Sequence, residues 1–255
     1  MATVLSGTSG ALYYSPAGTS ATFGESAVDV ADDEITIEAY LGFKVGDPVK
    51  FSVVDTTTGA AGTGTLPAGI TSGTTYYVIA YTASTGVLQV SATAGGTVIA
   101  ITDDGTAVSP NAFKVAYAAP AVVGSVRDWS FEITRSEIDV TTIGQTIGQY
   151  APFRTYITGF ADGSGSATVY TTDDATNLSS RMIEDVIQRS QSGATMKLYI
   201  DRISSGGAVS EALSRSITVP VIVTSASLSV NPDDGQSVAI NFRPSEAPTF
   251  DLSKS

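Results

Sequence analysis

The sequence predicts a mainly β protein with one α-helix and a separate small all-β domain. Three observations lead to this prediction. Short runs of β-branched and aromatic residues alternate with turn residues, and the 255-residue chain contains 25 Gly. One stretch has the apolar period of about 3.6 residues that is typical of a helix. A chain of this length can form one large or two modest domains.

The first β region runs from about residue 40 to residue 117. Turn sequences such as Gly46-Asp47-Pro48 and Gly95-Gly96 supply the positive or fixed φ angles that tight turns require. Between the turns we expect four short strands: Lys50–Val54, Thr75–Tyr81, Gly86–Ala92 and Thr97–Ile101. Residues 40–117 are therefore predicted to form a small all-β module.

A second β region begins near Val122. Alternation through the first strand predicts a partly buried surface, and its phase slips around residues 128–130, which indicates a bulge. The side chains expected on that surface are Val126, Trp129, Phe131, Ile133, Ile138 and Val140. Further strands are expected at Ser166–Thr172, Thr195–Ile203, Arg215–Val230 and Gln236–Pro244, the last two joined as a hairpin by the turn at residues 231–235.

One amphipathic helix is predicted at about residues 176–190. Its apolar side chains share one stripe, and Gly193 follows where a helix end is expected. A single helix in a β protein should lie across a face or an end of a sheet. The residues of the stripe are Leu178, Met182, Ile183, Val186 and Ile187.

Residues 141–156 form a long, Gly-punctuated and mostly uncharged segment between strands. Long loops are often functional, and exposed apolar side chains in them favour docking onto a neighbouring subunit. Trp129 is expected to anchor the core or a subunit interface. The predicted contacts between subunits are Ile143, Ile147, Tyr150, Phe153, Tyr156 and Trp129.

The composition argues against most catalytic chemistry. The chain has no Cys and no His, which removes thiol nucleophiles, disulfides and the usual general base. We expect no catalytic, cofactor or metal site, and no membrane span. A net charge of −12 repels phosphate, so tight binding of nucleic acid is not expected.

Three local patterns have a simpler explanation than a ligand site. Acidic turns such as Asp103-Asp104-Gly105 do not match a calcium loop and suit ordinary turns. The segment Gly163–Ser166 lacks the lysine of a phosphate-binding loop and is expected to be a flexible turn. Tyr76, Tyr77 and Tyr81 could stack on a sugar, but alternation places Tyr76 and Tyr77 on opposite faces, so at least one belongs to the core.

The order of elements after Val122 resembles the tail tube (major tail) proteins of long-tailed bacteriophages. The residues that carry this resemblance are VRDWSFEITRSEIDVTTIG (126–144), GFADGSGSATVYTT (159–172), SRMIEDVIQ (180–188), ATMKLYI (194–200), the hairpin SITVPVIVTSASLSVNPDDGQSVAINF (216–242) and the N-terminal ALYYSPAG (11–18). The segment 31–117 looks like a small β module of phage tail and fibre proteins.

The resemblance implies a tail-tube-like β-sandwich flanked by a helix, formed by residues 1–30 and 118–255, with the inserted domain on the tube exterior. It implies hexameric rings that stack into a tube in the virion, assembled in the host cytoplasm. DNA would pass through the lumen without specific binding. Implied partners are further copies and other tail proteins: the terminator, the tape measure and, in contractile tails, the sheath.

Two other classes of function remain open from the sequence. A phage fibre or bacterial surface adhesin would use the module at residues 40–117 to bind a host glycan. An enzyme that relies on carboxylates alone is the third alternative, and the missing His and Cys argue against it.

Overall fold

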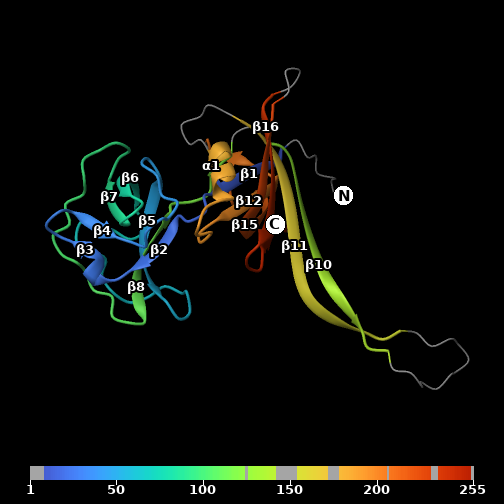
Figure 1. Ribbon diagram of the computed structural model, residues 1–255, viewed down its shortest axis with the longest axis horizontal. Coiled ribbons are helices and arrows are strands. Elements are labelled where there is room, and N and C mark those ends of the chain that lie inside the picture. Colours follow the sequence, from blue (N-terminus) through green and yellow to red (C-terminus); the bar gives the residue numbers. More distant parts are fainter. Residues whose placement is uncertain are drawn as a thin grey trace, which may run out of the picture.

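The computed structural model describes residues 9–123, 126–141, 154–171, 178–205, 207–230 and 235–253. It confirms the predicted mainly β architecture, with one α-helix in the described residues (Figure 1). Two large sheets each enclose a separate hydrophobic core. We call the unit around the eight-stranded sheet the body and the unit around the seven-stranded sheet, Ser20–Tyr117, the module.

The body sheet has the strand order β10-β11-β16-β15-β12-β1-β9, and β17 also pairs with β15. A separate two-stranded ribbon is formed by β13 (Ser204–Ser205) and β14 (Ala208–Val209). The strands of the body sheet are β1 (Ala11–Ser15), β9 (Ala121–Val122), β10 (Val126–Asp139), β11 (Tyr156–Tyr170), β12 (Thr195–Asp201), β15 (Arg215–Ser229), β16 (Ser237–Pro244) and β17 (Thr249–Asp251).

The long strand β15 belongs to two parts of this sheet. Its first half, Arg215–Pro220, pairs with β12, whereas residues 221–229 pair with β16 as the predicted hairpin. We call β10, β11, β16 and residues 221–229 of β15 the four-strand layer. All its pairings are antiparallel, and the predicted bulge is present as a register shift between Val126 and Asp128.

Helix α1 (Leu178–Asp185) packs against β15 and β16, as predicted for a helix that covers a sheet. Leu178 and Met182 are buried, and Ile183 and Val186 pack against the same core. The prediction that the helix continues to residue 190 is wrong. After Asp185 the backbone forms tighter bonds that span three residues, such as Gln188 N–H to the carbonyl of Asp185, and Ile187 is exposed.

The segment Gly163–Ser166 was expected to be a flexible turn, and it lies instead inside β11. The glycines there allow close approach of neighbouring side chains. A Cβ atom on Gly165 would lie 2.3 Å from Cζ of Phe242, and one on Gly163 would lie 2.8 Å from Cγ of Pro244. These positions are therefore glycine because a larger side chain would clash with β16, and not because a turn requires them.

The module sheet has the order β2-β8-β5-β6-β7-β4-β3. It begins at Ser20, before the boundary at residue 31 that the sequence suggested, because β2 pairs with β8 and β3 pairs with β4. A short 3-10 helix at Glu25–Ala27 lies between β2 and β3. The strands are β2 (Ser20–Phe23), β3 (Val28–Asp29), β4 (Glu34–Thr36), β5 (Pro48–Asp55), β6 (Thr75–Thr82), β7 (Val87–Ser91) and β8 (Asn111–Tyr117).

The predicted strand at Thr97–Ile101 is wrong. Its backbone makes one isolated bridge, between Val98 and Ser91. The N–H of Ile101 donates to Oδ1 of Asp33 at 2.7 Å instead of to a strand. Ile101 is nevertheless buried in the module core. An apolar side chain can therefore predict burial correctly where the segment is not a strand.

Candidate assembly surfaces

The four-strand layer has two open edges within the described residues. No described strand pairs with the outer side of β10, which begins the strand order. On the opposite side, pairing of β15 with β12 stops at Pro220, and residues 222–229 pair only with β16. Open edges of this length carry unpaired N–H and C=O groups that can pair with another chain.

The face of the four-strand layer that points away from the core carries rows of small polar side chains. One row joins Ser130, Ser166, Asn241 and Ser225 across all four strands. Its members are hydrogen-bonded: the hydroxyl oxygens of Ser130 and Ser166 lie 2.9 Å apart, and Nδ2 of Asn241 donates to Oγ of Ser225 at 2.8 Å. These hydrogen bonds pair the polar side chains along the row. A hollow of about 400 Å³ lies on this face, and Glu132, Thr224 and Arg243 also line it.

Charged side chains on the same face are mostly acidic. Asp128 and Glu132 lie two residues on either side of Ser130 in β10 and share its face. Asp162 lies four residues before Ser166 in β11 and shares the same face. Arg243 lies 3.6 Å from Asp162 and offsets that charge, although both side chains are exposed. Carboxylates on such a face disfavour close contact with phosphate.

Beyond the sheet, β10 and β11 continue as a two-stranded arm, residues 132–139 and 156–164. β11 pairs with β16 only from Gly165 onward, so the arm has no third strand in the described residues. Figure 1 shows it extending away from the body, on the side opposite the module. A lone two-stranded ribbon is marginally stable in water, which favours a partner in the assembled state.

The arm exposes large apolar side chains. Phe160 is 92% exposed, and Ile138 and Ile157 face each other across the two strands. The prediction of partial burial is wrong for Ile133, Ile138 and Val140, because no described element packs on this part of β10. The exposed apolar residues of the arm are Ile133, Ile138, Tyr156, Ile157 and Phe160, and Val140 directly follows its far end.

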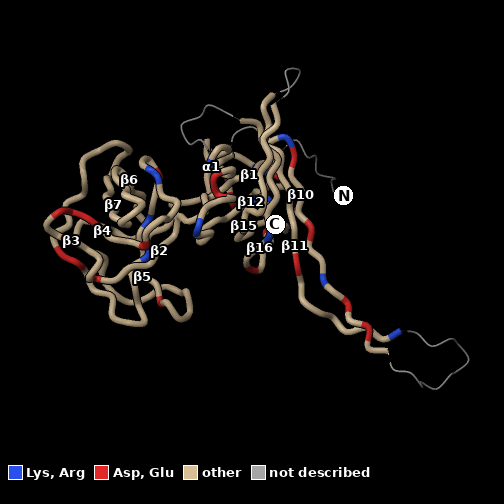
Figure 2. Tube along the Cα trace, in the orientation of Figure 1, with Lys and Arg blue, Asp and Glu red and all other residues tan. Residues whose placement is uncertain are grey.

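Charged residues of both signs are spread along the arm (Figure 2). Nε of Arg135 donates to the carbonyl of Gly159 at 3.1 Å, and Arg154 lies 3.5 Å from Asp139. Charged side chains on open strands discourage uncontrolled edge pairing. The charged residues of the arm are Glu132, Arg135, Glu137, Asp139 and Asp162.

The predicted contact residues are only partly visible in the structure. Trp129 is half-buried and packs against the body core, and Tyr156 is exposed at the start of β11. Ile143, Ile147, Tyr150 and Phe153 lie outside the described residues. Sequence reasoning missed Phe160 and Ile157, because the strand expected in this region begins only at Ser166, after the turn expected at Gly163–Ser166.

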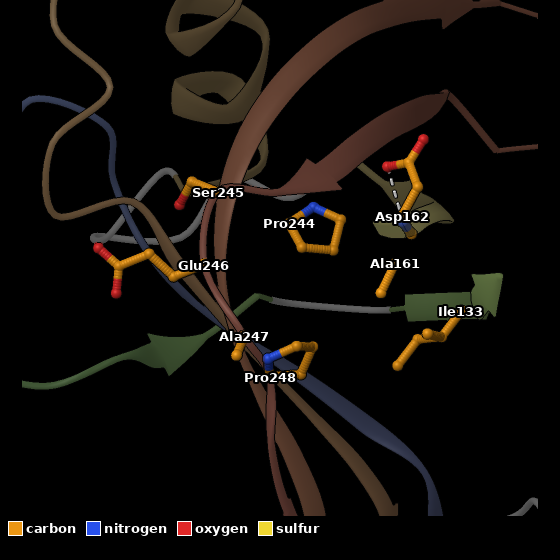
Figure 3. A pocket seen from close by; sticks show the side chains of 9 residues that line it. Ile133, Ala161, Asp162, Pro244, Ser245, Glu246, Ala247 and Pro248 are labelled. Carbon is orange, nitrogen blue, oxygen red and sulfur yellow. Dashed lines mark hydrogen bonds between the residues drawn. The ribbon is translucent and has the colours of Figure 1, made fainter. Parts of the chain in front are cut away.

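Two grooves border the four-strand layer. One of about 350 Å³ lies where the arm meets the turn after β16, between Ile133 and Ala161 on one side and Pro244–Pro248 on the other (Figure 3). Oδ1 of Asp162 accepts the N–H of Gly163 at its rim. The second, of about 510 Å³, lies beside Trp129 at the start of β10 and reaches β12.

The module is joined to the body through the polar side of α1. Arg181, which is 4% exposed, donates from Nη1 to Oδ1 of Asp47 at 2.5 Å and from Nη2 to the carbonyl of Gly42 at 2.5 Å. Nε2 of Gln188 donates to the carbonyl of Tyr40 at 2.9 Å. The loop at residues 40–47 is thus held by the helix.

A second buried carboxylate completes this junction. Asp185 accepts the hydroxyl of Tyr14 at 2.6 Å and the N–H of Ala17 at 2.9 Å, just before the chain enters the module. Burial raises the pKa of both Asp185 and Asp47, and the Arg181 charge opposes each rise. Burial also raises the pKa of Tyr117 to about 12, with Asp47 adding to the effect. The raised pKa values of the two carboxyl groups reflect the free-energy cost of burying a charge. The hydrogen bonds from Arg181, Tyr14 and Ala17 offset this cost.

Among the described residues, no cluster of three or more metal-ligating side chains occurs, and no helix is long and apolar enough to cross a membrane. Tyr76 lies in the module core, as predicted for one member of the tyrosine pair, and Tyr81 accepts the N–H of Leu41. The three tyrosines therefore do not form one exposed platform.

Comparisons with known proteins give partial likenesses. No protein-family model matches the sequence, and no curated protein matches it. A chain from the tail of an empty GTA particle with C6 symmetry has a TM-score of 0.38 and 15% identity, over 52% of this chain and 87% of that chain. A chain from the virion of a native gene transfer agent (GTA) particle has a TM-score of 0.37 and 16% identity, over 52% and 89%. At these TM-scores the likeness alone decides neither fold nor function.

Proposed function

We propose that this protein is a structural subunit of a phage-type tail tube, in which copies form rings that stack around a channel for DNA. The observation that carries the proposal is the four-strand layer with an open edge on each side. Its strands alternate in direction, so β15 of one copy meets β10 of the next in antiparallel orientation. If each copy pairs its β15 with β10 of the next copy around a rotation axis, the four-strand layers join into one closed sheet.

The dimensions of such a ring suit a DNA channel. The sequence resemblance implies six copies in a ring. If each contributes its four-strand layer, strands about 4.8 Å apart and tilted by about 40° close a barrel roughly 50 Å across. The row Ser130, Ser166, Asn241 and Ser225 would line the channel, because the opposite face packs on the core. Hydroxyls that bond one another and nearby carboxylates give DNA little to adhere to.

The remaining surfaces have a place in the same arrangement. The module lies on the other side of the body from the arm, which is consistent with a position on the tube exterior. The arm projects past the sheet and offers apolar side chains to a copy in the adjacent ring. We propose the virion as the location, with the terminator, the tape measure and, in contractile tails, the sheath as further partners.

Electron microscopy of the purified protein tests the ring. We expect rings or short tubes in negative stain as the concentration rises, with a central channel resolved in class averages. Sedimentation velocity on the same samples should show a concentration-dependent shift from monomer to a single larger species. Monomers alone at every concentration and ionic strength would contradict the proposal.

Phe160→Ser tests the role of the arm. Because Phe160 is 92% exposed in the single chain, the free energy of unfolding of the monomer should change by less than about 0.5 kcal/mol. Burying a phenylalanine at an interface is worth about 1.5–3 kcal/mol, so stacking of rings should weaken more than tenfold. Tube length by microscopy measures this.

Ile187→Ser is the matched control, since Ile187 is 86% exposed but lies after α1, away from the arm. It should leave tube length unchanged. Equal effects of the two substitutions would show that general surface hydrophobicity, and not the arm, drives stacking.

A further inference from the structure

The core-facing side of the four-strand layer carries apolar rows that stop abruptly at both open edges. One row joins Val126, Val169, Val238 and Leu228 through directly paired residues. Its two inner members are fully buried, whereas Leu228 is 59% exposed. A parallel row runs from Trp129 through Ala167 and Ile240 to Ala226, and its two end members are only half-buried.

A groove occupies the outer end of these rows on the β10 side. It has a volume of about 510 Å³, and its apolar walls are Val126 and Trp129 from β10 and Ile200 from β12. Val126, Trp129 and Ile200 also pack against the body core with their inner sides. The groove therefore adjoins that core. The rest of its lining is formed by Gly10, Arg127, Asp128 and Tyr199.

We propose that Leu228 of one copy inserts into the groove beside Trp129 of the next copy. This proposal rests on the ring arrangement proposed above. Where β15 of one copy pairs with β10 of the next, side chains keep their faces, so Leu228 points to the core-facing side of β10. Because the strands of a barrel are tilted, Leu228 of one copy is displaced by a few residues along β10 of the next copy. The groove extends along β10 from Val126 to Trp129 and therefore covers this displacement.

The pairing also explains an otherwise unfavourable edge. A strand edge with an exposed leucine pairs readily with any other strand and invites aggregation. Insertion into the groove would cover Leu228 and complete the row on both copies at once. Each copy has one such edge and one groove, as closed rings require.

Trp129 reports directly on the groove because it is the only tryptophan in the chain. We expect its fluorescence emission to shift to shorter wavelength, and its quenching by acrylamide to fall, when the wild-type protein assembles. In Leu228→Ala the concentration needed for half-assembly should rise at least tenfold. The emission of the Leu228→Ala monomer should equal that of the wild-type monomer, because Leu228 and Trp129 of one copy lie on the two outer strands of the four-strand layer.

Leu213→Ala is the control, since Leu213 is another exposed leucine of the body, outside the four-strand layer, and its loss should leave assembly and emission unchanged. Rings with unaltered Trp129 emission, formed equally well by Leu228→Ala, would overturn the insertion and leave the proposed function standing. Absence of rings in the wild-type protein would overturn the proposed function and the insertion with it. Thermal unfolding of Leu228→Ala at monomer concentrations should match the wild type, which separates loss of assembly from loss of fold.

Discussion

Asp47→Ala should lower the free energy of unfolding by about 3–5 kcal/mol, because it leaves a buried guanidinium without its carboxylate. The Arg181 and Asp47 side chains are only 5% and 8% exposed, so water cannot replace the lost partner. Asp47 also accepts the N–H of Lys44 at 2.9 Å, and the loop that contacts α1 would lose this bond too. Urea unfolding followed by circular dichroism measures the change.

A neighbouring ion pair provides the control. Lys44 and Glu184 also bridge the module and α1, but their side chains are 49% and 55% exposed. Glu184→Ala should therefore change the free energy of unfolding by less than about 1 kcal/mol. The double variant Asp47→Ala, Arg181→Met should recover part of the loss, because no uncompensated charge remains buried. If Asp47→Ala were as mild as Glu184→Ala, water would have to reach Arg181 in solution.

Phe242→Ala should have an effect of similar size, about 3–5 kcal/mol, because its ring is 1% exposed and fills the space above Gly165. The ring also stacks on Phe131, with 6.3 Å between the centroids. Loss of the ring would open a cavity in the middle of the four-strand layer. Thermal and urea unfolding of the monomer measure the loss.

A double-mutant cycle with Gly165 tests whether the two residues share that space. Gly165→Ala alone should destabilise by about 1–3 kcal/mol, since its methyl group meets the Phe242 ring. In the Phe242→Ala background the same substitution should cost much less. Gly24→Ala is the control, because Gly24 has open space around it and an ordinary φ of −102°. Strictly additive effects at Gly165 and Phe242 would contradict the packing.

The sequence predicted those parts of the fold that follow from one periodic signal. Runs of β-branched and aromatic residues between turn sequences located β5, β6, β15 and β16 to within a few residues, and the stripe from Leu178 to Val186 located the helix and its buried side. These signals are local, because one face of each element must meet a core.

Other features depend on partners distant in the sequence. Arg181 and Asp185 lie four residues apart on α1, yet both are buried. Arg181 donates to Asp47 of the module, whereas Asp185 accepts hydrogen bonds from the N-terminal segment that precedes the module. Gly163 and Gly165 read as a turn because the Phe242 ring and Pro244 above them come from β16, far along the chain. No local pattern contains that information, which is also why the length of β11 and the arm was missed.

The chain enters and leaves the module on neighbouring strands, since Ser20 at the start of β2 pairs with Ala116 near the end of β8. Paired backbones lie only about 5 Å apart. Chain ends this close make the junction a candidate graft site: a folded domain with equally close ends could replace the module. Such a graft would carry one design requirement, because cargo without a counterpart of Asp47 calls for a neutral residue in place of Arg181.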